Sequence, residues 1–119
     1  MKATELRIGN WLIGCDGINF KIDGHGIFTV EEEHTDCIQP IPLTPEILIK
    51  AGFKERPHLS DWFFKLPNTG TIFIYSYVFS MLSICASNEK PALFINMEYL
   101  HQLQNFIYIL TGKELEIVL

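Results

Sequence analysis

Turn-forming residues divide the N-terminal part of this 119-residue chain into short runs, and this division restricts which folds the chain can adopt. The turn sequences are residues 14–17 and 23–26, which are rich in Gly and Asp. Three apolar runs lie around these turns and are expected to be strands: residues 6–13, 18–22 and 27–30. Short strands joined by Gly and Asp turns are typical of a hairpin series or a small barrel. The sequence therefore predicts an antiparallel, barrel-like N-terminal meander, with a fourth strand near residues 37–38.

Residues 44–52 predict a short helix with a signal at each end. Thr44 can cap the free N-terminal amides, and Pro45 suits the first helical position, where its missing N–H costs nothing. Glu46 complements the positive end of the helix dipole. Gly52 can adopt the left-handed backbone conformation that ends many helices. We therefore expect a helix here, directly after the proline-containing connector of residues 39–43.

The rest of the chain predicts further strands and a second helix. Residues 62–66 and 71–75 flank the turn sequence 67–70 and predict a hairpin. The other expected elements are a strand within residues 76–86, a turn at 87–91, a strand at 92–95, a helix capped by Asn96 and ended by Gly112, and a strand at 114–119. The predicted fold class is therefore α+β, an antiparallel sheet system with two helices, in a single domain of residues 1–119.

The helix predicted after Asn96 has an apolar and a polar face. Apolar residues recur three and four positions apart: Leu100, Leu103, Phe106, Ile107 and Leu110. The polar face carries side chains that can donate and accept hydrogen bonds without a permanent charge: His101, Gln104, Asn105 and Tyr108. One hypothesis is that this polar face anchors the helix to neighbouring loops or strands. The other is that its residues form a binding surface for a partner protein or a second copy, because uncharged groups are cheaper to desolvate than charges.

Composition and charge exclude several classes of function. Hydrophobic residues make up 48% of the chain and charged residues 19%, which favours a packed globule over a disordered chain. The net charge is −5 and no basic run is present, so electrostatic capture of nucleic acid is not expected. Residues 66–88 carry no formal charge, but a turn sequence and several serines make them unsuited to span a membrane. The chain has three cysteines, no CxxC motif and no secretory segment, which predicts a reduced, cytoplasmic protein.

No catalytic or metal-binding motif is evident. Cys15, His25, His34 and Cys37 are of the residue types that bind zinc, but their spacing matches no zinc motif, so neither a metal nor a cofactor is predicted. The chain lacks a Gly-x-Ser-x-Gly sequence and a Cys–His pair indicated by local context, so the prediction is a protein that is not an enzyme. Aromatic residues between positions 62 and 79 could stack on bases, yet the favoured interpretation is core packing or an apolar dimer face.

Three stretches of the chain resemble a group of small proteins from Bacteroides-type gut bacteria that are often encoded in prophages and other mobile elements. The stretches are LRIGNW at residues 6–11, PIPLTPEIL at 40–48, and YLHQLQN at 99–105 followed by LTGKEL at 110–115. The resemblance implies a bacterial cytoplasmic protein, an accessory factor of a mobile element. It implies no mechanism.

Taken together, these features predict a non-enzymatic protein that acts through protein–protein contact. Residues 75–82 offer more apolar surface than a small sheet can readily hide, so the expected partners include a second copy of the chain as well as an unknown protein. The alternative is a weak nucleic-acid-associated factor that uses exposed aromatic residues, although the sequence supplies little positive charge for it.

Overall fold

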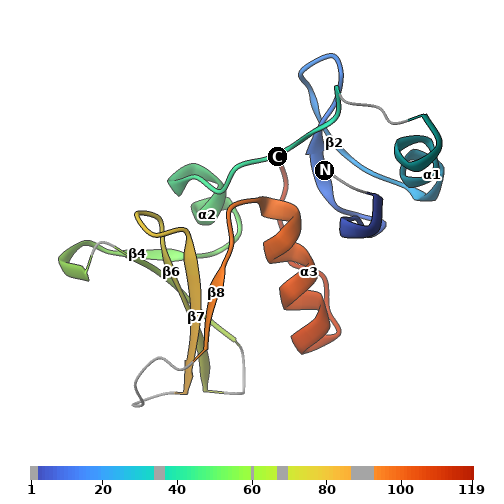
Figure 1. The fold of residues 1–119 in the computed structure, drawn as a ribbon. Helices are drawn as coiled ribbons and strands as arrows, with labels where there is room; N and C mark the ends of the chain where they lie inside the picture. Colours follow the sequence, from blue (N-terminus) through green and yellow to red (C-terminus); the bar gives the residue numbers. More distant parts are fainter. Residues whose placement is uncertain (1–2, 34–36, 60, 67–69, 87–92) are drawn as a thin grey trace. The chain divides into compact units, whose positions relative to one another are not determined.

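A computed structural model of the chain describes residues 3–33, 37–59, 61–66, 70–86 and 93–119 (Figure 1). The described residues contain α-helices and antiparallel sheets, which confirms the predicted α+β class. They group into two compact units. Unit 1 comprises residues 1–42, 99–115 and 119, and unit 2 comprises residues 43–98 and 116–118. The single domain expected from the sequence stays a prediction.

Unit 1 contains a three-stranded antiparallel sheet in the order β2-β1-β3. Its elements are η1 (Ala3–Glu5), β1 (Trp11–Ile13), β2 (Asn19–Lys21), α1 (Gly24–Glu33), β3 (Gln39–Pro40) and α3 (Leu100–Thr111). Among the described residues this sheet ends at β2 on one side and at β3 on the other, so the barrel-like closure expected from the sequence is not confirmed. The strands are shorter than the apolar runs that predicted them.

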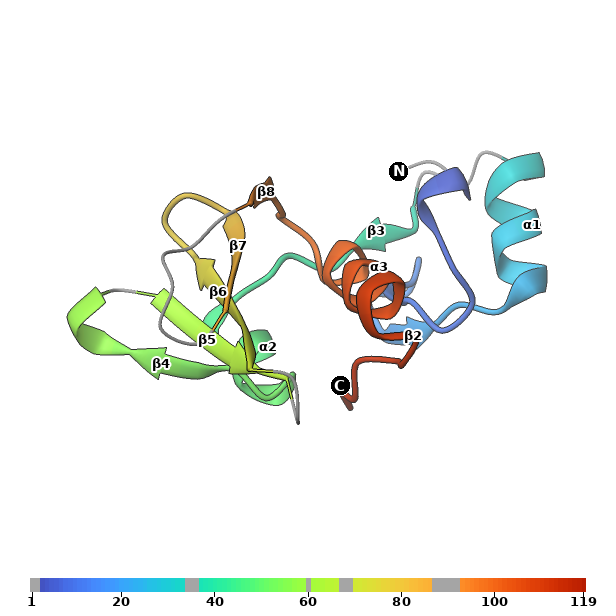
Figure 2. The ribbon, with the colours of Figure 1, turned by 90° about the horizontal axis from the view of Figure 1, so that it is seen from below.

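The small core of unit 1 joins this sheet to α1. Figure 2 shows α1 beside η1, the first blue helical turn of this unit. Leu12 of β1, Ile22 after β2 and Val30 of α1 are buried together. Further apolar side chains pack against them while staying part-buried: Ala3, Leu6, Phe20, Ile27 and Ile38. Burying each large apolar side chain stabilises the fold by roughly 1.5–3 kcal/mol relative to leaving it in water, so these residues hold α1 to the sheet.

Residues 27–30 lie within α1, and the strand predicted there is wrong. Asp23 starts the helix: its Oδ1 accepts a hydrogen bond from Gly26 N at 2.7 Å, and its carbonyl oxygen accepts one from Ile27 N at 3.0 Å. Ile27 and Val30 are three positions apart, so a helix directs both toward the core and leaves Phe28 exposed. Burial at helical spacing therefore outweighs the strand preference of these side chains. The sequence pattern treated Asp23 as a turn residue, whereas it caps the helix.

Unit 2 contains a five-stranded antiparallel sheet in which strands adjacent in the chain are adjacent in space, in the order β4-β5-β6-β7-β8. Its elements are α2 (Pro45–Lys50), β4 (Lys54–Arg56), η2 (Pro57–Leu59), β5 (Asp61–Lys65), β6 (Thr71–Ser76), β7 (Met81–Ala86) and β8 (Phe94–Asn96). The predicted hairpin is confirmed as β5 paired with β6, and the strands predicted within residues 76–86 and 92–95 are confirmed as β7 and β8. The predicted turn at 87–91 and residues 67–69 of the other turn lie outside the described residues.

The end signals predicted for the first helix are confirmed in α2. The Thr44 hydroxyl accepts a hydrogen bond from Ile47 N at 3.3 Å, and Pro45 is the first helical residue. Gly52 follows the last turn with φ of +99°, a backbone conformation that other residues adopt at a cost. The Phe53 ring then lies 5.3 Å from the Phe64 ring of β5, measured between centroids. Phe53, which follows α2, therefore packs on the sheet face that carries Phe64.

The C-terminal helix confirms one predicted boundary and corrects the other. Gly112 ends α3 with φ of +70°, as predicted. Asn96 belongs to β8, however, and the residue that precedes the first helical turn is Tyr99, whose backbone N–H donates to the Gln102 side chain at 3.0 Å. Residues 114–119 form no strand, although Leu115 and other alternate residues there are buried. No described helix has the length and apolar character needed to cross a membrane.

Candidate functional site

Gln104, on the predicted polar face of α3, connects this helix to the N-terminal segment of unit 1. The side chain is only 2% exposed. Its Oε1 accepts a hydrogen bond from Trp11 N at 2.9 Å, and its Nε2 donates one to the Gly9 carbonyl oxygen at 3.2 Å. Both ends of the amide are therefore engaged with backbone groups next to β1, as the anchoring hypothesis requires.

Asn105 makes a similar connection one residue later. Its Oδ1 accepts hydrogen bonds from Asn10 Nδ2 at 2.8 Å and from Arg7 Nε at 3.2 Å, while its Nδ2 donates to the Glu5 carbonyl oxygen at 3.0 Å. The buried Asn10 side chain also accepts a hydrogen bond from Arg7 N at 2.6 Å. Two amide side chains thus fix the loop between η1 and β1, and the geometry favours anchoring over recognition for Asn105 as well.

Arg7 continues this network toward the surface. Its guanidinium group donates to both carboxylate oxygens of Glu114, and its Cζ lies 4.2 Å from the centre of the Tyr108 ring. The hydrogen bond to Glu114 raises the pKa of Arg7, and the same bond lowers the pKa of Glu114. Tyr108 is the one predicted binding residue that is exposed, but one face of its ring meets Arg7. Since Arg7 is engaged by Asn105, Glu114 and Tyr108, the cluster is not arranged as an anion-binding site.

His101 is the fourth predicted binding residue, and it is buried with only 2% of its surface exposed. Neither ring nitrogen has a hydrogen-bond partner among the described residues. Its ring stacks on Tyr99, with 6.0 Å between centroids. Burial lowers the pKa of His101, partly opposed by the negative charge of Glu5. The imidazole is therefore neutral at pH 7 and is held away from solvent.

The burial of His101 predicts a loss of stability in mild acid. Its pKa is lowered in the folded chain and is about 6.5 in the unfolded chain, so below pH 6.5 the unfolded state binds the extra proton. Stability should therefore fall as the pH drops below 6.5, by up to about 1.4 kcal/mol per pH unit, until the folded-state pKa is reached. Urea denaturation between pH 8 and pH 5 measures this slope.

The variant His101→Phe should lose this component of the slope and be at least as stable as the wild type at pH 7, because it removes two unpartnered buried nitrogens. The exposed Ile109→Ala change on the same helix provides the control and should leave the slope unchanged. An unaltered slope in His101→Phe would mean that other groups cause the acid sensitivity.

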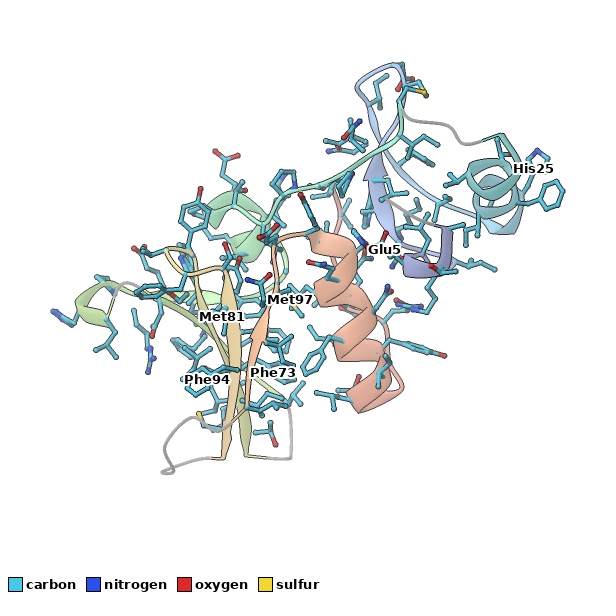
Figure 3. All side chains as sticks on the ribbon, viewed as in Figure 1. Glu5, His25, Phe73, Met81, Phe94 and Met97 are labelled. Carbon is cyan, nitrogen blue, oxygen red and sulfur yellow. A yellow bond between two sulfur atoms is a disulfide. The ribbon has the colours of Figure 1, made fainter. Side chains whose placement is uncertain are left out.

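One face of the unit 2 sheet carries apolar side chains with no described helix of unit 2 against it. We call this the open sheet face, and its residues are Phe63, Ile72, Ile74, Met81 and Phe94. The strand register places these residues on one side of the sheet. Phe63 opposes Ile74, Ile74 opposes Ser83, and Ser83 opposes Phe94. Ile72 and Met81 lie two positions from Ile74 and Ser83 on their strands, so their side chains point the same way. Phe73 points to the opposite, covered face, and the two faces can be compared at Phe73 and Phe94 in Figure 3. Phe94 is 63% exposed, and the other four are part-buried.

Among the described residues, charged side chains border the open sheet face on its β4–β5 side. Lys54 opposes Phe63 and Lys65 opposes Ile72, so both exposed lysines share the open side of the sheet. Arg56 and Asp61 also share it and form an ion pair, with Arg56 Nε and Nη2 each 2.7 Å from a carboxylate oxygen. The hydrogen bond to Asp61 raises the pKa of Arg56. The face thus changes from charged at β4 and β5 to mainly apolar from β6 to β8, where Ser76, Ser83 and Asn96 are its polar members and Ser83 and Cys85 are buried.

Cys15 and Cys37 form a disulfide, with 4.8 Å between their Cα atoms. The register of β1 and β3 explains the pairing: Ile13 opposes Gln39, so residues two positions further out, 15 and 37, oppose each other as well. The predicted reduced state is therefore wrong for this pair, while Cys85 is a buried free thiol. The sequence could not reveal the pairing because it depends on β1 and β3 lying side by side.

The disulfide also bears on the zinc alternative. Cys15 and Cys37 are bonded to each other, His25 lies on α1 (Figure 3), and His34 lies outside the described residues. Within the described part of the chain, no group of three or more His, Cys, Asp and Glu side chains could hold a metal ion. An open hollow of about 350 Å³ next to the disulfide is lined mainly by apolar residues: Gly14, Cys15, Asp16, Ile18, Phe20 and Ile38. These residues form no recognisable catalytic set.

No protein-family model, curated protein or solved structure matches this chain. Sequence reasoning anticipated an apolar dimer face among the aromatic residues 62–79, but it did not identify the residues of the open sheet face. The sequence did contain a signal for this face. Residues 72–75 are continuously apolar, whereas a strand with one solvated face alternates between apolar and polar residues.

Proposed function

We propose that this chain is a non-enzymatic protein that acts by binding a protein partner through the open sheet face of unit 2. The observation that carries the proposal is the contrast between the two faces of this sheet: Phe53, which follows α2, packs against Phe64 on one face, and no described helix of unit 2 lies against the other. The solvated face of an antiparallel sheet normally carries polar side chains. An apolar face with an exposed Phe94 is instead typical of an interaction surface.

The hydrogen bonds and the burial of the polar residues of α3 support placing the binding surface on unit 2. Gln104 and Asn105 are occupied by hydrogen bonds to the N-terminal segment, and His101 is buried. A partner that used these amides would have to break those bonds and leave backbone groups of unit 1 unsatisfied, at about 1–3 kcal/mol for each buried group. The open sheet face requires no such exchange.

The proposed context is that of an accessory factor of a mobile element in the bacterial cytoplasm. It is supported by the resemblance of LRIGNW, PIPLTPEIL, YLHQLQN and LTGKEL to proteins of Bacteroides-type bacteria and their prophages. A cytoplasmic setting keeps most cysteines reduced, so the Cys15–Cys37 disulfide would there be exposed to reduction. In that setting, the stability of the chain with the disulfide reduced is the quantity to measure.

The alternative proposal, a weak nucleic-acid-associated factor, has one observation in its favour. Lys54 and Lys65 lie on the same side of the sheet as Phe63 and Phe94, and aromatic residues flanked by positive charge can bind single strands. The net charge of −5 weighs against it, since phosphate binding depends on many cationic contacts. Salt-sensitive retention on single-stranded DNA would favour this alternative.

A substitution in the middle of the open sheet face tests the proposed function. A photo-crosslinking residue placed at Met81 identifies the partner in lysate, and binding is then measured by calorimetry with that partner purified. The variant Ile72→Glu should weaken binding at least tenfold, because a charge would be desolvated in the contact. The matched control is Ile18→Glu, at a position of unit 1 that is 65% exposed, and it should bind as the wild type does.

Melting temperatures of both variants separate loss of binding from loss of folding. If Ile72→Glu unfolds, Phe94→Ser at the exposed end of the face replaces it. Wild-type affinity in a folded open-face variant would refute the proposed function, as would a chain that crosslinks to no protein.

A further inference from the structure

Strand β8 forms one edge of the unit 2 sheet: it pairs with β7 and with no other described strand. Two residues beyond β8, the Glu98 carbonyl oxygen accepts a hydrogen bond from Leu43 N at 2.9 Å, so the edge left for a further strand is Phe94–Asn96. The neighbours of β8 in the chain show which backbone groups are used. The Leu93 carbonyl oxygen and the Met97 N–H bond toward β7, at 3.3 Å and 2.7 Å. Because backbone groups alternate in direction along a strand, the N–H and C=O groups of Phe94 and Asn96 point away from β7. The edge therefore presents donors and acceptors to a further strand.

The two edges of this sheet differ in the protection that natural sheets usually carry. At the opposite edge, every residue of β4 (Lys54–Arg56) is charged, and Pro57 follows it. Charged residues and proline on an edge strand hinder pairing with another strand. In β8 (Phe94–Asn96) there is neither a charge nor a proline, and both end residues are exposed. Of the two edges, β8 carries less of this protection within the strand and is the better suited to accept a further strand.

We infer that β8 pairs antiparallel with β8 of a second copy of this chain and so forms a homodimer. The inference goes beyond the proposed function, because it concerns the edge of the sheet and leaves the open sheet face uncovered. The register follows from the outward groups: Phe94 pairs with Asn96 of the second copy, Asn96 pairs with its Phe94, and Ile95 lies on the two-fold axis. Each of these pairs makes a backbone hydrogen bond in both directions.

The side chains make this pairing self-complementary. In the strand register Phe94 lies on the open sheet face, and pairing at β8 makes the open faces of both copies continuous. The two Phe94 side chains become diagonal neighbours, about 7–8 Å apart, within reach of aromatic contact. The lysines of the open side stay at the far edge of each sheet, because Lys54 belongs to β4 and Lys65 to β5. Like charges are thus kept apart, each Phe94 faces Asn96 of the other copy, and the two Ile95 residues face each other.

Sedimentation velocity over a concentration series of the purified full chain tests the inference. We expect the wild type to be dimeric at the upper end of the series. The variant Asn96→Pro removes an outward N–H without touching the β7 ladder, and Phe94→Lys adds a charge to the edge, so each should shift the dissociation constant at least tenfold. Phe79→Lys, at a position in the β6–β7 turn that is 74% exposed, is the matched control and should remain dimeric.

A cysteine scan tests the register independently of stability. Cross-strand neighbours on the axis are about 4.5 Å apart between Cα atoms, so Ile95→Cys should form a covalent dimer on mild oxidation. Phe79→Cys should not. Hydrogen exchange gives a second reading, since the amides of Phe94 and Asn96 should become protected as the protein concentration rises.

Each outcome is decisive. A wild type that stays monomeric throughout the series overturns the inference, as does a dimer that Asn96→Pro and Phe94→Lys leave intact, or an Ile95→Cys variant that fails to crosslink. The proposed function survives these results if a different purified protein still binds the wild type and loses affinity for Ile72→Glu. The proposed function fails separately when Ile72→Glu and Phe94→Ser both bind the purified partner as tightly as the wild type does.

Discussion

Reduction of the Cys15–Cys37 disulfide is expected to lower the free energy of unfolding by about 3 kcal/mol. The bond closes a loop with a sequence separation of 22 residues, which contains β2 and α1. Opening the loop increases the conformational freedom of the unfolded chain much more than that of the folded chain, in which β1 and β3 remain paired. Urea denaturation with and without dithiothreitol measures the difference.

The double variant Cys15→Ser/Cys37→Ser provides the control for this prediction. It should match the reduced wild type in stability and show no further response to dithiothreitol. The buried thiol of Cys85 is retained in both proteins, so its chemistry cancels in the comparison. Equal stability of the oxidised wild type and the double variant would show that the disulfide contributes nothing to the folded chain.

The variant Gln104→Ala is expected to lose about 2–3 kcal/mol of stability. The substitution removes the acceptor Oε1 and the donor Nε2 of Gln104. As a result, Trp11 N loses its hydrogen bond to Oε1, and the Gly9 carbonyl oxygen loses its hydrogen bond from Nε2, at a partly buried site. Since these bonds join residues more than ninety positions apart in the chain, they contribute tertiary rather than helical stability. Thermal and urea unfolding both report the loss.

Ile109→Ala on the solvent side of the same helix is the matched control. Its side chain is well exposed, and the change should alter stability by no more than about 0.5 kcal/mol. If Gln104→Ala were as stable as this control while binding of the partner disappeared, the polar face of α3 would be a recognition surface and the anchoring hypothesis would be wrong.

Local signals in the sequence predicted the elements whose ends are set by nearby residues. Thr44, Pro45 and Gly52 act within a few residues of α2, and Gly112 ends α3 in the same way, so these boundaries could be predicted. The β5–β6 hairpin follows from apolar runs on either side of a turn sequence. Each of these features depends on contacts that are short in sequence.

The errors arise where distant contacts decide the structure. Residues 27–30 are helical because Ile27 and Val30 meet a core formed by β1 and the residue after β2, which no local pattern reveals. The polar face of α3 was recognised, but whether its amides bind a partner or Gly9 and Trp11 depends on a packing partner far along the chain. The Cys15–Cys37 disulfide depends likewise on β1 pairing with β3.

The order of residues in the two units has a consequence for how the chain folds as it is synthesised. Unit 1 is divided in the sequence: residues 1–42 come first, and α3, which supplies Gln104 and Asn105, comes after all five strands of the unit 2 sheet. That sheet pairs neighbouring strands only, so it can assemble from local contacts while the ribosome is still at work. The N-terminal strands must wait for the last helix before Trp11 N and Asn10 find their partners. The part of the chain made first is therefore the part expected to be completed last.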